Sequence, residues 1–201
     1  MNKNPPPDLE ILRKQLVDVC NTLDKMGVEY HLEGGTLLGI VRDGDILPWD
    51  KDTDISIMAR DADRLPELMR KLRMKGWRCK LKRFKMDNAF ARCGDARILK
   101  VKRRSKWFFT PDQRHMLDVF VKHSDGDQVY WQAGKCFMAV DAKYYEGHDE
   151  ISWRGMSVKI PKFHEAFLEE KYGDWRVPVK DWDFTMEKTI FARAPDASIQ
   201  E

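Results

Sequence analysis

Residues 49–57 read Trp49-Asp50-Lys51-Asp52-Thr53-Asp54-Ile55-Ser56-Ile57. Their alternation predicts a β-strand from Asp52 to Ile57. Because alternate side chains of a strand share a face, we expect Asp52 and Asp54 to project together about 7 Å apart. Two convergent carboxylates repel each other unless a cation lies between them, and such hard oxygen ligands suit Mg²⁺ or Mn²⁺. An acidic turn before a strand is the alternative interpretation of the same residues.

A glycine pair lies upstream of these aspartates. Gly34-Gly35-Thr36 follows a strand-like segment, residues 28–33, and opens a short predicted helix that ends near Arg42. Backbone N–H groups at a helix N-terminus attract phosphate, and the Thr36 hydroxyl would add a donor. The order of these residues predicts a phosphate-binding turn beside a metal site, although an ordinary turn also uses glycines.

Asp118 is an acid within an otherwise apolar segment, Met116-Leu117-Asp118-Val119-Phe120-Val121. We predict a strand here. Burying an unpaired carboxylate is costly, so Asp118 should meet a metal, an arginine or a proton that is transferred.

The remaining pattern predicts an α+β domain with a mixed or antiparallel sheet flanked by helices. Apolar residues spaced by three or four predict helices over 9–26, 61–75 and 163–172. Strand-like segments beyond Gly76 are 77–84, 89–93, 98–102, 116–122, 129–133 and 151–160. We expect one domain over residues 1–201, with flexible ends at 1–7 and 190–201.

Composition excludes several classes of protein. The 201 residues are 42% hydrophobic and 34% charged with a net charge of +3, which indicates a folded globule and makes a nucleic-acid partner unlikely on charge alone. No apolar run approaches the roughly 20 residues of a membrane span, and the N-terminus lacks the apolar core of a signal peptide. The four cysteines form no CxxC pair. We therefore expect a cytoplasmic protein with no membrane span.

Positive charge is concentrated in one part of the chain. Residues 70–106 contain sixteen Lys or Arg and only two acids, Asp87 and Asp95. Such a surface could attract a phosphorylated donor or a polyanionic acceptor. Alternating cations also protect the edges of sheets, so a solvated face is an equal alternative.

Three blocks of the sequence resemble the LicD/fukutin-related phosphotransferases, a family of the nucleotidyltransferase superfamily. The first is Gly34-Gly35-Thr36-Leu37-Leu38-Gly39-Ile40-Val41-Arg42, the second Ile46-Leu47-Pro48-Trp49-Asp50-Lys51-Asp52-Thr53-Asp54-Ile55, and the third, looser block Leu168-Glu169-Glu170-Lys171-Tyr172-Gly173-Asp174-Trp175. The resemblance spans roughly residues 28–178 and implies a nucleotidyltransferase-like mixed sheet.

The resemblance also implies site residues. Asp52 and Asp54 stand at the paired metal ligands, Asp118 stands at the third carboxylate, and these three would be catalytic. Gly34, Gly35, Thr36 and Arg42 stand at positions that would bind donor phosphate, and Arg42 could alternatively hold Asp50. Lys51 departs from the acidic residue of many members.

The implied reaction moves a phospho-alcohol, such as phosphocholine or ribitol phosphate, from a CDP-linked donor to a glycan hydroxyl with Mg²⁺ or Mn²⁺ and releases CMP. One alternative is a true nucleotidyltransferase, which places a nucleoside monophosphate on a small molecule and releases pyrophosphate. Another alternative is a catalytically idle module that binds RNA or another polyanion.

Overall fold

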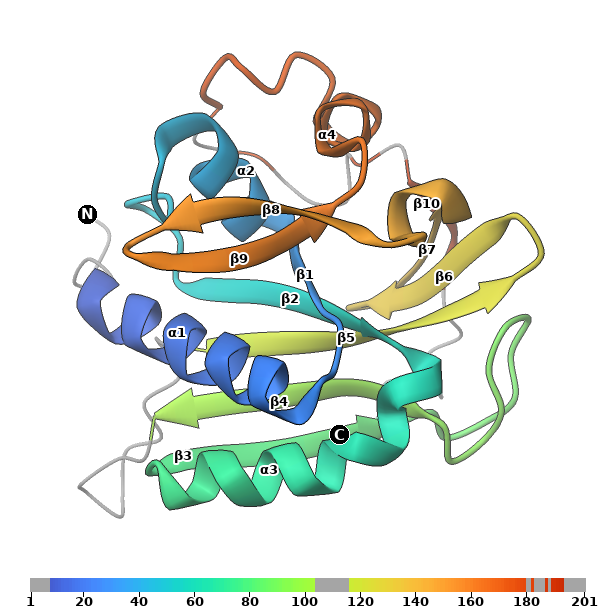
Figure 1. Ribbon diagram of the computed structural model, residues 1–201. Helices are drawn as coiled ribbons and strands as arrows, with labels where there is room; N and C mark the ends of the chain where they lie inside the picture. Colours follow the sequence, from blue (N-terminus) through green and yellow to red (C-terminus); the bar gives the residue numbers. More distant parts are fainter. Residues whose placement is uncertain (1–7, 104–115, 180–181, 183–186, 188, 194–201) are drawn as a thin grey trace, which may run out of the picture.

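The computed structural model describes residues 8–103, 116–179, 182, 187 and 189–193. Figure 1 shows a sheet with helices on its faces. The helices are α1 (Leu9–Met26), α2 (Gly34–Asp43), α3 (Leu65–Met74) and α4 (His164–Tyr172), with 3₁₀ segments η1 (Ala59–Arg64) and η2 (Ala142–Tyr145). The strands are β1 (His31–Glu33), β2 (Asp52–Met58), β3 (Trp77–Arg83), β4 (Ala96–Arg103), β5 (Met116–Asp125), β6 (Gln128–Ala133), β7 (Cys136–Asp141), β8 (His148–Trp153), β9 (Met156–Pro161) and β10 (Ile190–Arg193).

The main sheet is mixed, which confirms the predicted α+β class. Its eight strands run in the order β1-β2-β5-β6-β7-β10, and β4 joins β5 to β3. Strands β2 and β5 are parallel, whereas β5 is antiparallel to β4 and to β6. Because β5 lies between β2 and β4, residues far apart in the sequence share one face of the sheet.

Helices α1 and α3 cover one face of this sheet (Figure 1). The Asp8 side chain accepts a hydrogen bond from the Ile11 N–H, and Gly27 ends α1 in the left-handed conformation at φ 66°. The apolar stripe predicted from spacing is buried, with Leu12, Leu16 and Val19 fully inaccessible. This layer leaves the opposite face of β2 and β5 available for polar side chains.

The chain beyond β3 differs from the prediction in three places. Residues 89–93 form no strand but a loop in which the Asn88 side chain accepts from Phe90 N and Ala91 N. The single strand predicted over 151–160 is the hairpin β8–β9, whose turn contains Arg154 and Gly155 at positive φ. Strand β7 was not predicted.

The chain end also differs from the prediction. Residues 190–193, expected to be flexible, form β10 and pair with β7. The other residues predicted to be flexible, 1–7 and 194–201, lie outside the described residues. No helix within the described ranges combines the length and apolar character needed to cross a lipid bilayer.

Candidate active site

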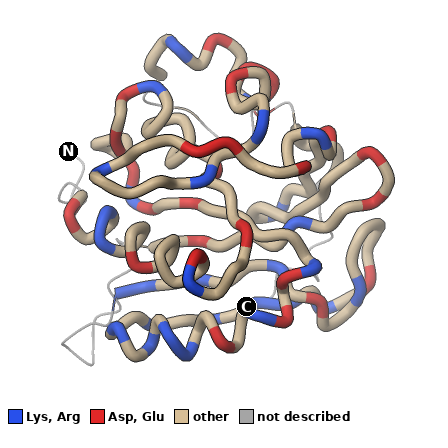
Figure 2. Tube along the Cα trace, viewed as in Figure 1, with Lys and Arg blue, Asp and Glu red and all other residues tan. Residues whose placement is uncertain are grey.

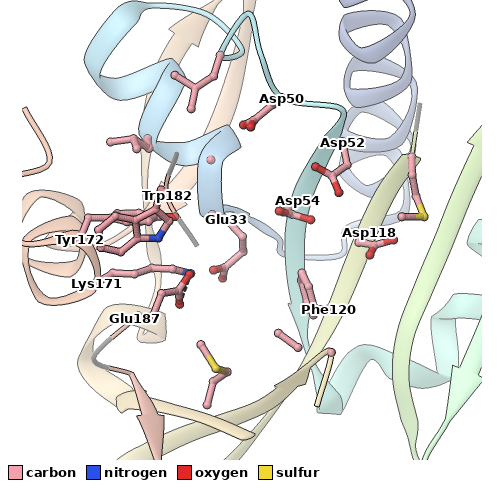
Figure 3. A pocket seen from close by; sticks show the side chains of 18 of the residues that line it. Glu33, Asp50, Asp52, Asp54, Asp118, Phe120, Lys171, Tyr172, Trp182 and Glu187 are labelled. Atoms are coloured by element: carbon pink, nitrogen blue, oxygen red, sulfur yellow. Dashed lines mark ion pairs between the residues drawn. The ribbon is translucent and has the colours of Figure 1, made fainter. Parts of the chain in front are cut away.

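The three predicted carboxylates lie on adjacent strands. Asp52 and Asp54 are alternate residues of β2, and Asp54 is directly opposite Asp118 of β5 in the parallel register. Asp50 precedes β2 in the loop after α2, and Figure 3 shows all four acids along one side of a pocket. The pairing of β2 with β5 therefore brings together acids that are 64 positions apart in the chain, from Asp54 to Asp118.

These acids line a cleft of about 530 Å³, a volume typical of small-molecule sites. The opposite wall comes from α4 and the segment after it, which contribute Lys171, Tyr172, Trp182 and Glu187 (Figure 3). The remaining lining residues are Glu33, Gly34, Gly35, Leu38, Leu47, Trp49, Lys100, Met116, Phe120, Trp131, Ala133, Gly134, Met138 and Val179.

Burial and mutual repulsion shift the ionisation of these acids. Burial, followed by the charges of Asp52 and Asp118, raises the pKa of Asp54 well above its ordinary value. Burial and the Asp52 charge raise the pKa of Asp50 to about 6. The pKa of Asp52 is also raised, first by burial and then by Asp118. The cleft thus contains more acidic side chains than cations, and burial favours the protonated forms of these acids.

One cation already meets this cluster. Lys100 lies opposite Asp118 in the β4–β5 register, and its Nζ is 2.8 Å from Asp118 Oδ2. The other carboxylate oxygen, Oδ1, is buried with no hydrogen-bond partner. Burial raises the pKa of Asp118 although Lys100 opposes the shift. A buried acceptor without a donor identifies a position where a further cation would be stabilised.

The donor set fits a hard divalent ion. Carboxylate oxygens are the preferred protein ligands of Mg²⁺, and Asp118 Oδ1 is a buried carboxylate oxygen without a hydrogen-bond partner. Within the described ranges, no three His, Cys, Asp or Glu side chains are already arranged around one metal position. The three carboxylates would therefore have to reorient to share an ion.

The glycine pair permits close approach of two acids to α2. A Cβ on Gly34 would lie 2.9 Å from Asp54 Oδ2, and a Cβ on Gly35 would lie 2.3 Å from Asp50 Oδ2. Gly34 also has φ 55°, in the left-handed region that favours glycine. Both glycines line the cleft at the N-terminus of α2, where the helix dipole favours negative charge.

The side chains of Thr36 and Arg42, which were predicted to bind donor phosphate, do not line the cleft. The buried Thr36 hydroxyl accepts a hydrogen bond of 2.9 Å from the Asp54 backbone N–H, so it joins α2 to β2 instead of lining the cleft. Arg42 is at the opposite end of α2, paired with Asp43 at 2.8 Å and bonded to the Trp175 carbonyl at 3.2 Å. Arg42 therefore does not hold Asp50, because a ten-residue helix separates its ends by about 15 Å.

A buried ionic network supports the floor of the cleft. Glu33 Oε1 accepts hydrogen bonds from Ser56 at 2.7 Å and Tyr145 at 2.5 Å, and lies 3.1 Å from Lys122 Nζ. Lys122 is fully buried, with its Nζ 3.3 Å from the centroid of the Trp131 ring. Burial lowers the pKa of Lys122 to about 8, while Glu33 opposes the shift. The network fixes Glu33 directly before α2 and fixes one aromatic wall of the cleft.

A second buried pair lies on the α4 side. Lys171 Nζ is 3.4 Å from Glu187 Oε2, which also accepts from the Thr189 hydroxyl at 3.2 Å. The Tyr172 and Trp182 rings meet edge to face with centroids 5.3 Å apart. None of these residues was predicted to belong to the site, although Lys171 and Tyr172 lie in the third block of the resemblance.

Comparison with known proteins is consistent with this geometry. The family model for LicD/FKTN/FKRP, nucleotidyltransferase domain, matches residues 27–163. A human protein named Ribitol-5-phosphate transferase FKTN is 26% identical over 176 residues, which are 85% of this chain and 34% of that protein. The human Ribitol 5-phosphate transferase FKRP is 45% identical over 64 residues, 32% of this chain and 13% of that protein. The chain thus spans about a third or less of the length of these curated relatives.

Among solved structures, the lincosamide antibiotic adenylyltransferase LnuA with bound lincomycin aligns with a TM-score of 0.46 and 15% identity. That alignment covers 81% of this chain and 87% of the LnuA chain.

Proposed function

Because the chain belongs to the LicD/FKTN/FKRP nucleotidyltransferase-domain family, we propose that it is a phosphotransferase that uses a CDP-linked phospho-alcohol. It would transfer the phospho-alcohol to a hydroxyl of a glycan and release CMP. The names of its relatives, ribitol-5-phosphate transferases, make a ribitol-phosphate-like group the first donor to test. A phosphocholine donor is the second to test.

The observation that carries this proposal is the position of Asp52, Asp54 and Asp118. These three acids lie on two paired strands, face one cleft and leave one buried carboxylate oxygen without a partner. Such repulsion between acids is relieved where a bound cation compensates it, and perturbed acids of this kind mark functional sites.

Asp52, Asp54 and Asp118 would hold Mg²⁺ or Mn²⁺ next to the N-terminus of α2. When bound, the ion would neutralise the pyrophosphate of the donor and stabilise the departing nucleotide. Because Gly34 and Gly35 have no side chains, the carboxylates of Asp54 and Asp50 can approach this end of the helix; a Cβ at either position would collide with them.

In the proposed step, the acceptor oxygen attacks the phosphorus that carries the alcohol. A new P–O bond forms, the bond from that phosphorus to the bridging oxygen breaks, and CMP leaves with the electron pair. The proton of the acceptor hydroxyl passes to a carboxylate of the cleft, for which Asp118 is the candidate because it lines the cleft between Lys100 and Asp54. Tyr172 and Trp182 provide apolar surface that excludes water from the opposite wall.

The test incubates the protein with CDP-ribitol, CDP-choline, CDP-glycerol or CTP, each with Mg²⁺, Mn²⁺ or EDTA. Released nucleotides are separated and measured, and slow hydrolysis without an acceptor suffices. The test variant is Asp52→Asn. Its matched control is Asp63→Asn, the same substitution at an exposed position of η1 outside the cleft.

We expect CMP from at least one CDP-alcohol, abolished by EDTA, reduced by at least about 100-fold in Asp52→Asn and unchanged in Asp63→Asn. Pyrophosphate from CTP would instead identify a nucleotidyltransferase. Absence of both products, together with no metal-dependent donor binding, would contradict the proposal and leave the idle binding module as the alternative.

A further inference from the structure

Five cations extend along the cleft face of β3 and β4. They are Arg78, Lys80 and Lys82 of β3 and Lys100 and Lys102 of β4, here called the basic strip. Each is separated from the next on its strand by one residue, so all five project from the same face. The intervening residues, among them Leu99 and Val101, belong to the core under α1 and α3. Figure 2 shows Lys and Arg recurring along this part of the molecule.

The strand registers place the basic strip directly beside the acidic cluster. Asp54 is opposite Asp118, Asp118 is opposite Lys100, and Lys100 is opposite Lys80. One row across four strands thus changes from acidic to basic. Since neighbouring strands are about 4.8 Å apart, Lys80 begins about 10 Å from the Asp118 backbone.

The arrangement of the basic strip is unfavourable for the folded protein alone. Arg78 is directly opposite Lys102, and Lys80 is directly opposite Lys100. Like charges in such cross-strand pairs are destabilising. Among the residues that the structure describes, Arg78, Lys80 and Lys102 have no carboxylate partner, and Arg78 and Lys80 are exposed.

Protection of a sheet edge explains only part of the basic strip. Within the described chain, β3 pairs with β4 alone, so its alternating cations could discourage pairing with another molecule. Strand β4 is paired on both sides, with β3 and β5, and has no free edge to protect. Lys100 pairs with Asp118, but edge protection does not account for Lys102.

We propose that the basic strip binds anionic groups of the acceptor glycan. This inference rests on the proposed phosphotransferase function. Arg78, Lys80 and Lys102 lie outside the cleft that would hold the donor, so they face a molecule that extends beyond it. An acceptor that carries phosphate, sulfate or carboxylate groups near the reacting hydroxyl would cross β5, β4 and β3 with its charges on the basic strip.

The chemistry of the basic strip favours an anionic glycan over RNA. Nucleic-acid platforms combine cations with aromatic side chains on which bases stack. The aromatic residue of β3 and β4, Trp77, is buried and donates its indole N–H to Asp18 at 2.9 Å. The described part of the basic strip thus offers charge without a stacking surface.

The test compares Arg78→Gln/Lys80→Gln with Lys25→Gln/Arg70→Gln. Both variants remove two exposed cations, but Lys25 and Arg70 belong to α1 and α3 on the opposite side of the sheet. Binding of fluorescein-labelled dextran sulfate is measured by anisotropy over a range of NaCl concentrations. Neutral dextran and single-stranded poly(U) RNA are the comparison probes. Donor hydrolysis is measured as CMP release in the same preparations.

We expect Arg78→Gln/Lys80→Gln to weaken dextran sulfate binding by about tenfold or more and to reduce the slope of log K against log salt by about two. The control variant should retain the wild-type slope. Equal effects of both variants, no effect of either, or tighter binding of poly(U) than of dextran sulfate at equal charge would overturn the inference. Loss of CMP release in the Arg78→Gln/Lys80→Gln variant would also overturn it, since that result would assign these cations to the donor.

The two proposals fail separately. If wild-type protein releases no CMP from any donor, the proposed function fails whatever the binding data show. If CMP is released but the basic strip variant binds dextran sulfate like the wild type, only the acceptor inference fails.

Discussion

At the scale of single residues, the site is shaped by glycines as much as by acids. Gly34 and Gly35 stand where any Cβ would contact the carboxylates of Asp54 and Asp50. The sequence suggested that these glycines form a phosphate turn, and the structure adds that they give two acids room at a helix N-terminus. Gly34 combines a left-handed backbone conformation with close approach of the Asp54 carboxylate, so a substitution at this position tests both roles.

Replacing Gly34 by alanine should reduce stability and displace Asp54. The left-handed φ of 55° costs alanine about 1–2 kcal/mol, and the 2.9 Å contact with Asp54 Oδ2 adds strain. Urea denaturation measures the first effect, and CMP release per folded molecule measures the second. Gly27→Ala is the control, because Gly27 has φ 66° but nothing within 4 Å of its Cβ position. Equal CMP release by the two variants would show that Gly34 matters only for its backbone.

Replacing Lys122 by methionine should unfold much of the protein under mild denaturant. The change leaves the Glu33 carboxylate, which is 3% exposed, without its cation, and such uncompensated charges cost about 3–5 kcal/mol. The free energy of unfolding in urea measures this loss. Adding Glu33→Gln should restore part of it, because the double variant contains no buried unpaired charge.

A suitable comparison for Lys122→Met is Lys14→Met at the surface pair Lys14–Asp18. The Lys14 side chain is 66% exposed, so its loss should change stability by less than about 1 kcal/mol. If both lysine variants had similar stability, the buried network would not stabilise the floor of the cleft.

At the scale of elements, α2 sets the position of the acidic cluster. The N-terminus of α2 contacts Asp54. The loop after α2 folds back along the helix so closely that a Cβ on Gly39 would lie 2.6 Å from the Asp45 carbonyl oxygen. Asp45 fastens this loop by accepting from Arg13 and from the Trp153 indole. The helix, the loop and β2 thus form one unit that directs Asp50 and Asp54 into the cleft.

The hydrogen bond between Thr36 and β2 should control the geometry of this unit. Thr36→Val removes the acceptor of the Asp54 N–H, and an unsatisfied buried donor costs about 1–3 kcal/mol. We expect lower stability in urea and a lower rate of CMP release per folded molecule. Thr36→Ser keeps the hydroxyl and should preserve both. Loss of activity in Thr36→Ser would argue that the threonine methyl group, not the hydrogen bond, is required.

At the scale of the whole molecule, one face of the sheet carries the core and the other carries the chemistry. The core face is closed by α1 and α3, and the cleft face receives its second wall from α4 and the chain after it. A smaller aromatic cluster, in which the His123 ring meets the Phe84 ring edge to face and the Phe90 ring at a tilt, closes the end of the sheet near β6. This cluster makes folding sensitive to pH.

The contribution of His123 to stability should fall as the pH decreases below the ordinary histidine value, whereas the cleft acids, whose pKa values are raised, act in the opposite direction. His123 is 9% exposed, and burial lowers its pKa from 6.5, so the unfolded chain binds the proton more readily than the folded protein. Between pH 7.5 and 5.5 this residue contributes a loss of at most about 1.4 kcal/mol. The urea midpoint at the two pH values measures the change. Acidification should therefore lower the urea midpoint of the wild type relative to that of His123→Phe, because the acids and His31 titrate in both proteins. An unchanged pH dependence in His123→Phe would contradict this account.

The parts of the structure that local sequence determines were predictable. The spacing from Leu9 to Met26, with Asp8 before it and Gly27 after it, encodes α1, because helix periodicity and capping act within a few residues. The alternation from Asp52 to Ile57 likewise encodes β2 and places its two acids on one face. The apolar residues around Asp118 marked it as a candidate, and the family resemblance assigned it as the third carboxylate.

Tertiary structure decided which distant residues meet. Strand β10 forms where Ile190 pairs with Met138. The basic strip lies beside the acids because β4 pairs with β5. Neither pairing can be predicted from residues that are neighbours in the sequence. The second wall of the cleft, with Lys171 and Glu187, depends in the same way on how α4 packs. The sequence by itself therefore determined the chemical groups and their local orientation. The cleft, the burial that shifts their ionisation and the arrangement of opposing charges arose only when non-local strand pairing overcame the entropy of closing long loops.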